Sequence, residues 1–143
     1  MNTELLFNVI TWMGVPMWVI FILAPKSKAT RYLVQSTWPW LVYGIVYSAI
    51  AASGMLTITD FDLAGFFTLE GVKYMYNYDL TGIASWVHIL AWDLFLARWM
   101  LLDAPDAGYR LSPVLLLTYG FGPAGVMCFL LTRRGFLKGG HAQ

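Results

Sequence analysis

The sequence has little of the charge that soluble proteins carry on their surfaces. Charged residues make up 12% of its 143 residues, against about 25% in a soluble globular protein. No basic run is present, and we expect no nucleic-acid partner. The single cysteine, Cys128, excludes a disulfide within the chain. The only histidines are His88 and His141, and because His141 lies in the polar tail, a two-histidine iron site is excluded.

Hydrophobic residues are abundant instead, at 59% of the chain, and they gather in four long runs. A helix needs about 20 mostly apolar residues to cross a bilayer, and the runs cover residues 5–24, 37–58, 84–102 and 111–132. The first run has no basic region before it and no cleavage site after it, so we interpret it as a retained span. We predict an all-α polytopic membrane protein, with residues 1–143 forming a single domain of four transmembrane helices in a compact bundle within membrane lipid.

The third run is unusual because it carries His88, Asp93 and Arg98 at bilayer depth. An ionisable side chain there costs roughly 2.5–3.5 kcal/mol on insertion scales, so each must face protein, water or a ligand. At about 100° per residue, His88 shares one stripe with three aromatic rings, whereas Asp93 and Arg98 point to other sides. We therefore expect a central helix with neighbours on several sides, and no pairing between Asp93 and Arg98. The three rings are those of Trp92, Phe95 and Trp99.

These polar groups suit proton transfer. His88 is the candidate base, Asp93 or Glu70 is the candidate acid, and Arg98 is placed to hold a carboxylate or an oxygen. Two alternatives stay open. A metal could be held by His88, Asp93 and Glu70. Otherwise the role is structural, with Asp93 and Arg98 forming hydrogen bonds between helices and His88 bonding a backbone carbonyl.

The longest connection, residues 59–81, mixes acidic side chains with aromatic rings. Connections of this length are often functional. We expect Phe66, Phe67, Glu70, Val72 and Tyr74 to form a short interfacial helix that packs over one end of the bundle and closes a pocket there. The alternative is a solvated loop with aromatic anchors.

Glycine and proline gather in the middle of the fourth run. Residues 120–125 match the pattern GxGxxG, but the strand and the acidic residue that dinucleotide binding requires are missing. Three glycines and Pro123 predict a kink, with neighbouring backbone or a ligand pressed close. In the second run, Tyr43 and Tyr47 recur at helical spacing, next to a row of small residues that permits close helix packing, namely Gly44, Ser48 and Ala52.

The distribution of Lys and Arg does not decide the orientation of a chain that crosses four times. Lys26, Lys28, Arg31 and Arg110 would lie on one side, and Lys73, Arg133, Arg134 and Lys138 on the other. The first helix usually dominates the positive-inside rule, which favours an external N-terminus.

Two patterns in the third and fourth runs are similar to those of a known family. The third run reads Trp86-x-His88-x-Leu90-Ala91-x-Asp93-Leu94-Phe95-x-x-Arg98-Trp99, and the fourth reads Leu117-Thr118-x-x-Phe121-Gly122-Pro123-x-Gly125. The chain thereby resembles the abscisic-acid-deficient-four-like family, whose plant members are the neoxanthin synthases. The resemblance covers nearly the whole chain.

The resemblance implies a membrane protein that acts on carotenoids, by an acid and base isomerisation of an epoxide end group that needs no redox cofactor. Oxygen-dependent carotenoid cleavage and non-catalytic binding of a carotenoid or lipid are the alternatives. We expect the bacterial inner membrane as its location, where plant relatives lie in plastid membranes, and the chain is compatible with an oligomer. The residues expected to contact the ligand are Trp86, Trp92, Phe95, Trp99, Tyr43, Tyr47, Phe121 and Gly122.

Overall fold

The computed structural model describes residues 2–58 and 63–138, with the side chains of Leu63, Leu137 and Lys138 left out. His141 therefore lies outside the described residues. Within the described ranges the chain forms helices and connections only, with no strand. The four long apolar segments are residues 3–23, Trp38–Thr57, Asp79–Asp103 and 108–136, each long and apolar enough to cross a membrane. The predicted all-α architecture is confirmed.

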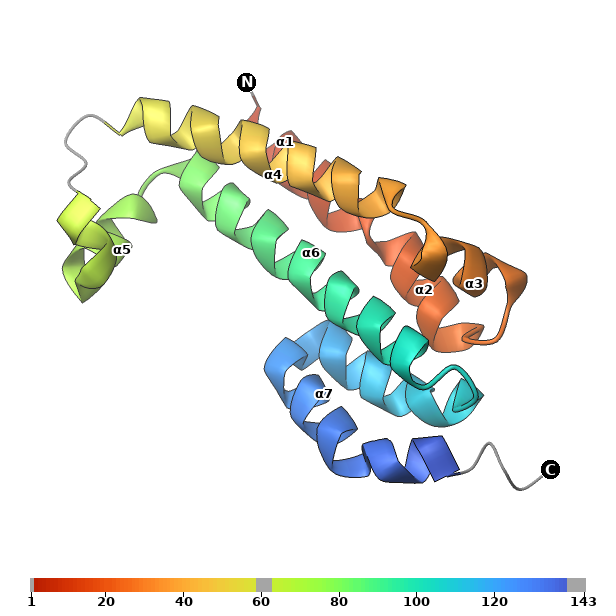
Figure 1. The fold of residues 1–143 in the computed structure, drawn as a ribbon. Helices are drawn as coiled ribbons and strands as arrows, with labels where there is room; N and C mark the ends of the chain where they lie inside the picture. Colours follow the sequence, from red (N-terminus) through yellow and green to blue (C-terminus); the bar gives the residue numbers. More distant parts are fainter. Residues whose placement is uncertain (1, 59–62, 139–143) are drawn as a thin grey trace.

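Helix α6 (Asp79–Asp103) is the centre of the structure. Helix α4 (Trp38–Thr57) packs along it, and α1 (Thr3–Met13) and α7 (Ser112–Lys138) contact it on other sides. Figure 1 shows α4 and α6 running side by side, with α1 behind them and α7 at one end. Leu94 and Ala97, in the middle of α6, are fully buried. The prediction that this helix has neighbours on several sides is confirmed.

The first apolar segment is broken near its middle. Helix α1 ends at Met13, and α2 (Val15–Leu23) begins with a proline in its first turn. Proline is tolerated there because its missing N–H would have no partner in the first turn. A Cβ atom at the intervening Gly14 would lie 2.6 Å from the Tyr43 hydroxyl of α4. Glycine is therefore needed at the break so that α4 can approach.

A short helix that the sequence analysis missed, α3 (Lys28–Gln35), connects α2 to α4. Its N-cap is Ser27, whose hydroxyl accepts a hydrogen bond of 3.0 Å from the Thr30 N–H. The helix buries Thr30 and Val34 and exposes its basic residues. Because it has eight residues and only a short apolar stretch, Tyr32 to Val34, it has no apolar run long enough to be found by hydropathy.

The connection between α4 and α6 contains two short helical elements. A 3₁₀ turn, η1 (Leu63–Phe67), is followed by α5 (Leu69–Met75), whose N-cap Thr68 accepts a 3.1 Å hydrogen bond from the Gly71 N–H. The predicted short helix is found for Glu70, Val72 and Tyr74 in α5, whereas Phe66 and Phe67 lie in the preceding 3₁₀ turn. Figure 1 shows it beyond the ends of α4 and α6, at the opposite end of the molecule from α7.

Helix α7 follows a short 3₁₀ turn, η2 (Gly108–Leu111), and folds back on itself. Its backbone leaves the helical region at Phe121, with φ −148° and ψ 61°. The two halves then lie so close that a Cβ atom at Gly125 would collide with Thr118. Arg133, near the end of the second half, donates two hydrogen bonds of 2.5 and 2.6 Å to Asp103, the last residue of α6. The predicted kink is confirmed, and it forms a helical hairpin (Figure 1).

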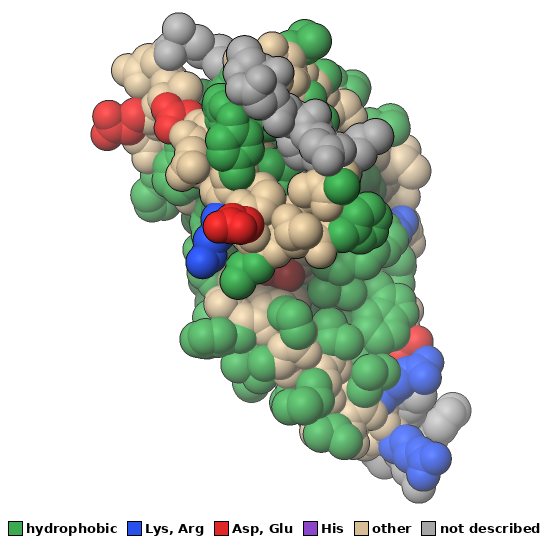
Figure 2. Space-filling view, turned by 90° about the vertical axis from the view of Figure 1, so that its left-hand side faces the viewer, with side chains coloured by type: hydrophobic (Ala, Val, Ile, Leu, Met, Phe, Trp, Pro, Cys, Tyr) green, Lys and Arg blue, Asp and Glu red, His purple; other side chains and the backbone are tan. Residues whose placement is uncertain are grey.

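The hairpin changes the distribution of positive charge. The expectation that Arg133 and Arg134 lie opposite Arg110 is wrong, because both halves of α7 meet the same end of α6. Among the described side chains, this end carries Lys26, Lys28, Arg31, Arg110, Arg133 and Arg134, whereas the other end carries Lys73. Figure 2 shows a face with many hydrophobic side chains, with Lys and Arg at its lower end and further basic atoms beside an acidic side chain near mid-height. From the positive-inside rule we predict that the α3 and α7 end faces the cytoplasm.

This orientation can be tested by labelling single cysteines after replacing Cys128 by Ser. In intact bacterial cells, we expect a membrane-impermeant maleimide to label Asn77→Cys, because it lies in the connection before α6. Lys28→Cys and Arg134→Cys should react only after the cells are permeabilised. In intact cells, labelling of both Arg134→Cys and Asn77→Cys without labelling of Lys28→Cys would contradict the hairpin. That pattern would place Arg134 on the same side of the membrane as Asn77.

Candidate functional site

Two adjoining cavities lie in the seam between α4 and α6. The larger, about 580 Å³, lies toward α5, and the smaller, about 200 Å³, continues toward the start of α4. Tyr47 of α4 and His88 of α6 line both cavities. We call the two together the α4–α6 groove. It is a single elongated site with Tyr47 and His88 at its middle.

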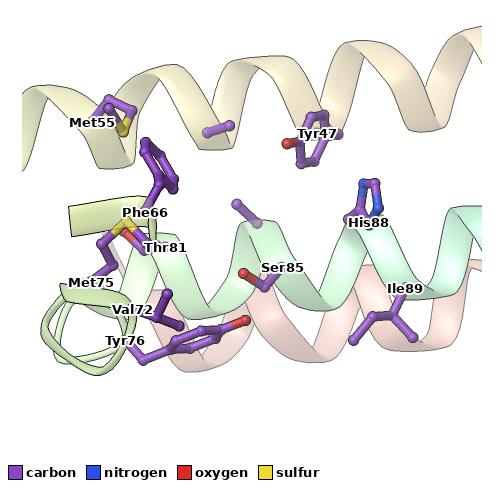
Figure 3. A pocket seen from close by; sticks show the side chains of 12 residues that line it. Tyr47, Met55, Phe66, Val72, Met75, Tyr76, Thr81, Ser85, His88 and Ile89 are labelled. Carbon is purple, nitrogen blue, oxygen red and sulfur yellow. The ribbon is translucent and has the colours of Figure 1, made fainter. Parts of the chain in front are cut away.

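The larger cavity has apolar walls and a few polar groups that converge. The connection before α6 covers it with Phe66, Val72, Met75 and Tyr76. Figure 3 shows the side chains of Tyr47, Ser85 and His88 directed into the same space, with Tyr76 and Thr81 nearer the covered end. A mostly apolar pocket with a few convergent polar groups is typical of a small-molecule site.

Sequence reasoning named Tyr47 and His88 but missed Thr81, Ser85 and Tyr76. Thr81 and Ser85 precede His88 by seven and three residues, which places all three on one face of α6. That spacing was the available signal, but the predicted span began at residue 84, so Thr81 was assigned to the loop. Tyr76 had no such signal, because its place depends on how the connection folds over α4.

The smaller cavity is lined by a chain of aromatic rings. His88 stacks on Trp92 with 6.4 Å between ring centroids, and Trp92 stacks on Phe95 at 5.8 Å. Across the groove, Tyr47 lies 5.6 Å from His88 and Trp40 lies 5.9 Å from Phe95. Trp92 and Phe95 are 56% and 41% exposed, on the surface that lipid would cover in a membrane. The predicted stripe therefore forms one wall of a groove that is accessible from lipid.

Trp99, the fourth predicted member of the stripe, lies outside the groove. Its ring packs on Phe129 of α7, with centroids 5.1 Å apart. Trp86 is also directed elsewhere: its indole N–H donates a 3.0 Å hydrogen bond to the Thr11 hydroxyl of α1. Both tryptophans hold α6 to neighbouring helices.

Arg98 closes the end of the groove away from α5. Its guanidinium lies 5.7 Å from the Trp40 ring and 5.9 Å from the Phe95 ring. Its Nε donates a 2.6 Å hydrogen bond to the carbonyl of Val34, near the end of α3. The predicted hydrogen bond between helices is thus found for Arg98. Its remaining N–H groups have no protein acceptor among the described residues and can face a ligand.

Asp93 lies on a different side of α6 from His88. Its carboxylate is pressed against Gly122 at the bend of α7, where a Cβ atom would collide with it. No described residue donates a hydrogen bond to this carboxylate, so the structural alternative of a hydrogen-bonded Asp93 is not observed. Gly122 is required there because only its hydrogen leaves room for the carboxylate.

The predicted catalytic residues do not meet in one place. His88 lines the groove, Asp93 faces α7, and Arg98 lies at the far end of the aromatic wall. Glu70 is exposed on α5 and is not among the residues that line the groove. In the part of the chain that the structure describes, no three His, Cys, Asp or Glu side chains are close enough to hold a metal. The structure thus does not assemble the metal site considered for His88, Asp93 and Glu70.

Two further predicted ligand residues, Tyr43 and Phe121, have different surroundings. Tyr43 contributes to the wall of the smaller cavity and is 3% exposed. Its hydroxyl points toward Gly14 and has no hydrogen-bond partner in the described ranges. Phe121 is 70% exposed at the bend of α7, outside the groove. Of the eight predicted contact residues, those in the groove are Tyr43, Tyr47, Trp92 and Phe95.

The fold and the groove define the class of the protein: an all-α membrane protein with an aromatic groove between two of its helices. Within this class the chain belongs to the ABA DEFICIENT 4-like family, whose model matches residues 5–129. The family resemblance found in the sequence is confirmed.

A relative in Arabidopsis thaliana, named Protein ABA DEFICIENT 4, chloroplastic, is 25% identical over 134 residues. The match covers 89% of this chain and 60% of the relative, so this chain spans little more than half the length of that relative. No solved structure matches the chain.

The contact between Gly122 and Asp93 gives a stability prediction. We expect Gly122→Ala to lower the free energy of unfolding by about 1–3 kcal/mol, because the added methyl group overlaps the carboxylate. Gly120→Ala is the matched control, since a Cβ atom there meets nothing within 4 Å. Thermal unfolding of the purified protein measures both. Asp93→Ala should remove the penalty of Gly122→Ala, and equal stability of the two single glycine variants would contradict the contact.

Proposed function

We propose that this protein binds a carotenoid along the α4–α6 groove and isomerises its oxygenated end group by acid and base chemistry. The proposal depends on the surroundings of His88. Its imidazole lies near the middle of α6, is exposed at the groove, and makes no hydrogen bond to any described residue. An ionisable group at this depth is by default a sign of function. A ligand in the groove would supply the hydrogen-bond partner that the His88 imidazole lacks.

The groove suits a long conjugated ligand in length and in chemistry. From Thr81 to Arg98 it follows α6 for about 25 Å, and a carotenoid is about as long as the hydrocarbon core is thick, roughly 30 Å. The flat faces of Trp92 and Phe95 offer stacking surfaces for a polyene. The larger cavity has room for a ring end group next to Tyr47, Ser85 and His88.

The reaction proposed is the opening of an epoxide to an allene with a tertiary hydroxyl group. One proton is delivered to the epoxide oxygen as its C–O bond breaks, and one proton leaves the polyene carbon as the new double bond forms. The atoms balance without an oxidant or a reductant. In the groove His88 takes the proton, and the Tyr47 hydroxyl, whose ring lies 5.6 Å from the imidazole, serves as the acid.

This assignment differs from the acid inferred from the sequence. Asp93 and Glu70 are stronger acids than a tyrosine, but Asp93 is directed to α7 and Glu70 is exposed on α5. Neither lines the groove. Arg98 keeps its proposed role, because its free N–H groups at the far end of the groove can hold an oxygen on the other end of the ligand.

Binding in the groove can be tested by filling it. We expect Gly44→Phe to abolish retention of pigment when the protein is purified from a carotenoid-producing bacterium. Gly44 lines the smaller cavity, and the space in front of it is free. Gly82→Phe is the control, because Gly82 is equally unobstructed but lies outside the groove. The absorption spectrum of the purified protein measures retention, and full retention by Gly44→Phe would place the ligand elsewhere.

Catalysis is tested separately from binding. We expect His88→Ala to keep bound pigment but to reduce conversion at least about 100-fold, the lower range for loss of a general base. Tyr47→Phe should also reduce conversion, whereas Asp93→Asn should not. Chromatography of pigments from the producing host, with and without each variant, measures this. Unaltered pigment with the wild-type protein would favour binding without catalysis, and shortened products that require oxygen would favour cleavage.

A further inference from the structure

A third cavity, of about 470 Å³, lies at the positively charged end of the molecule and has no part in the groove. It is bounded by the turn between α2 and α3, by α3 itself, and by the end of α6 with the turn that follows. Two cations, Lys26 and Arg31, lie at this cavity together with the apolar side chains of Val34, Leu101 and Leu102. It therefore combines positive charge with a hydrophobic wall.

The two cations are not neutralised by the protein. In the described ranges the ion pair found is that of Arg133 with Asp103. Asp106 also lines the cavity, but it lies within salt-bridge distance of neither Lys26 nor Arg31. A site with two cations and one carboxylate keeps a net positive charge of about one, which favours a lipid headgroup of net negative charge over a zwitterionic one.

Both cationic side chains contact the protein backbone. Arg31 donates a 2.9 Å hydrogen bond from Nη1 to the carbonyl of Lys26. The aliphatic stem of Lys26 lies over Gly108, where φ is 58° and a Cβ atom would collide with the stem. Thr30 fixes the same turn by donating a 2.6 Å hydrogen bond to the carbonyl of Ala24. The cations thus lose little conformational freedom when an anion binds.

The position of the cavity favours a lipid headgroup over a soluble phosphate as the bound anion. Leu102, on its apolar wall, is 43% exposed on the outer surface, where an acyl chain can lie. The neighbouring helix α3 exposes Lys28, Arg31 and Tyr32, as helices in the membrane interface do. Basic pockets between helices on the cytoplasmic side are suited to anionic lipid headgroups. We propose that this cavity binds the phosphate of an anionic phospholipid, with Lys26 and Arg31 as its ligands.

Native mass spectrometry of the delipidated protein tests the site, with dioleoylphosphatidylglycerol and dioleoylphosphatidylcholine as probes. We expect the wild type to bind one phosphatidylglycerol in preference to phosphatidylcholine. Lys26→Gln and Arg31→Gln should each weaken that binding about fivefold. Lys28→Gln is the matched control, since Lys28 is an exposed cation of α3 that does not line the cavity.

Three results would overturn the proposal. One is equal binding of the two lipids by the wild type. Another is an equal loss of phosphatidylglycerol binding in Lys28→Gln, which would indicate a diffuse surface effect. The third is displacement of the lipid by millimolar inorganic phosphate, which would assign the cavity to a soluble phosphate. Monodisperse elution of each variant controls for folding.

Discussion

Charged side chains on α6 have to be shielded from hydrocarbon, and the rest of the structure is arranged around that constraint. Asp93 is covered by the bend of α7, Arg98 is bound by Trp40 and the end of α3, and Asp103 is paired with Arg133. Helix α7 thus covers Asp93 and Asp103, whereas α4 and α3 together hold Arg98. His88 differs, because no described side chain or carbonyl bonds it. This unsatisfied group supports the proposal that the α4–α6 groove binds a ligand.

The α7 hairpin links this shielding to the orientation of the chain. Because the second half of α7 returns to the end of α6 where the first half begins, Arg133 and Arg134 join the cations of α3. The same end carries the basic cavity proposed to bind lipid phosphate. The opposite end holds the covered part of the groove, with the aromatic residues of η1 and α5. The two proposed sites therefore lie toward opposite faces of the membrane.

Much of the architecture could be predicted from the chain alone. The four apolar segments were predicted, and so was the short helix around Glu70, because both depend on local composition. The central place of α6 followed from His88, Asp93 and Arg98 pointing to different sides. Helix α3 was missed, because eight residues with few apolar positions produce no hydropathy signal. Trp99 was placed in the groove because helical spacing gives the direction of a Cβ atom but not the side-chain rotamer.

The sequence by itself determined the class of protein, the number of apolar segments, the family and the aromatic stripe beside His88, because these depend on residue types at fixed spacings. Tertiary structure alone decided that His88 and Asp93 belong to different sites and that α7 turns back toward its own beginning. It also brought Tyr76 of the connection to the groove. The physical reason is that these outcomes depend on contacts between residues far apart in the chain, such as Gly122 with Asp93 and Arg133 with Asp103.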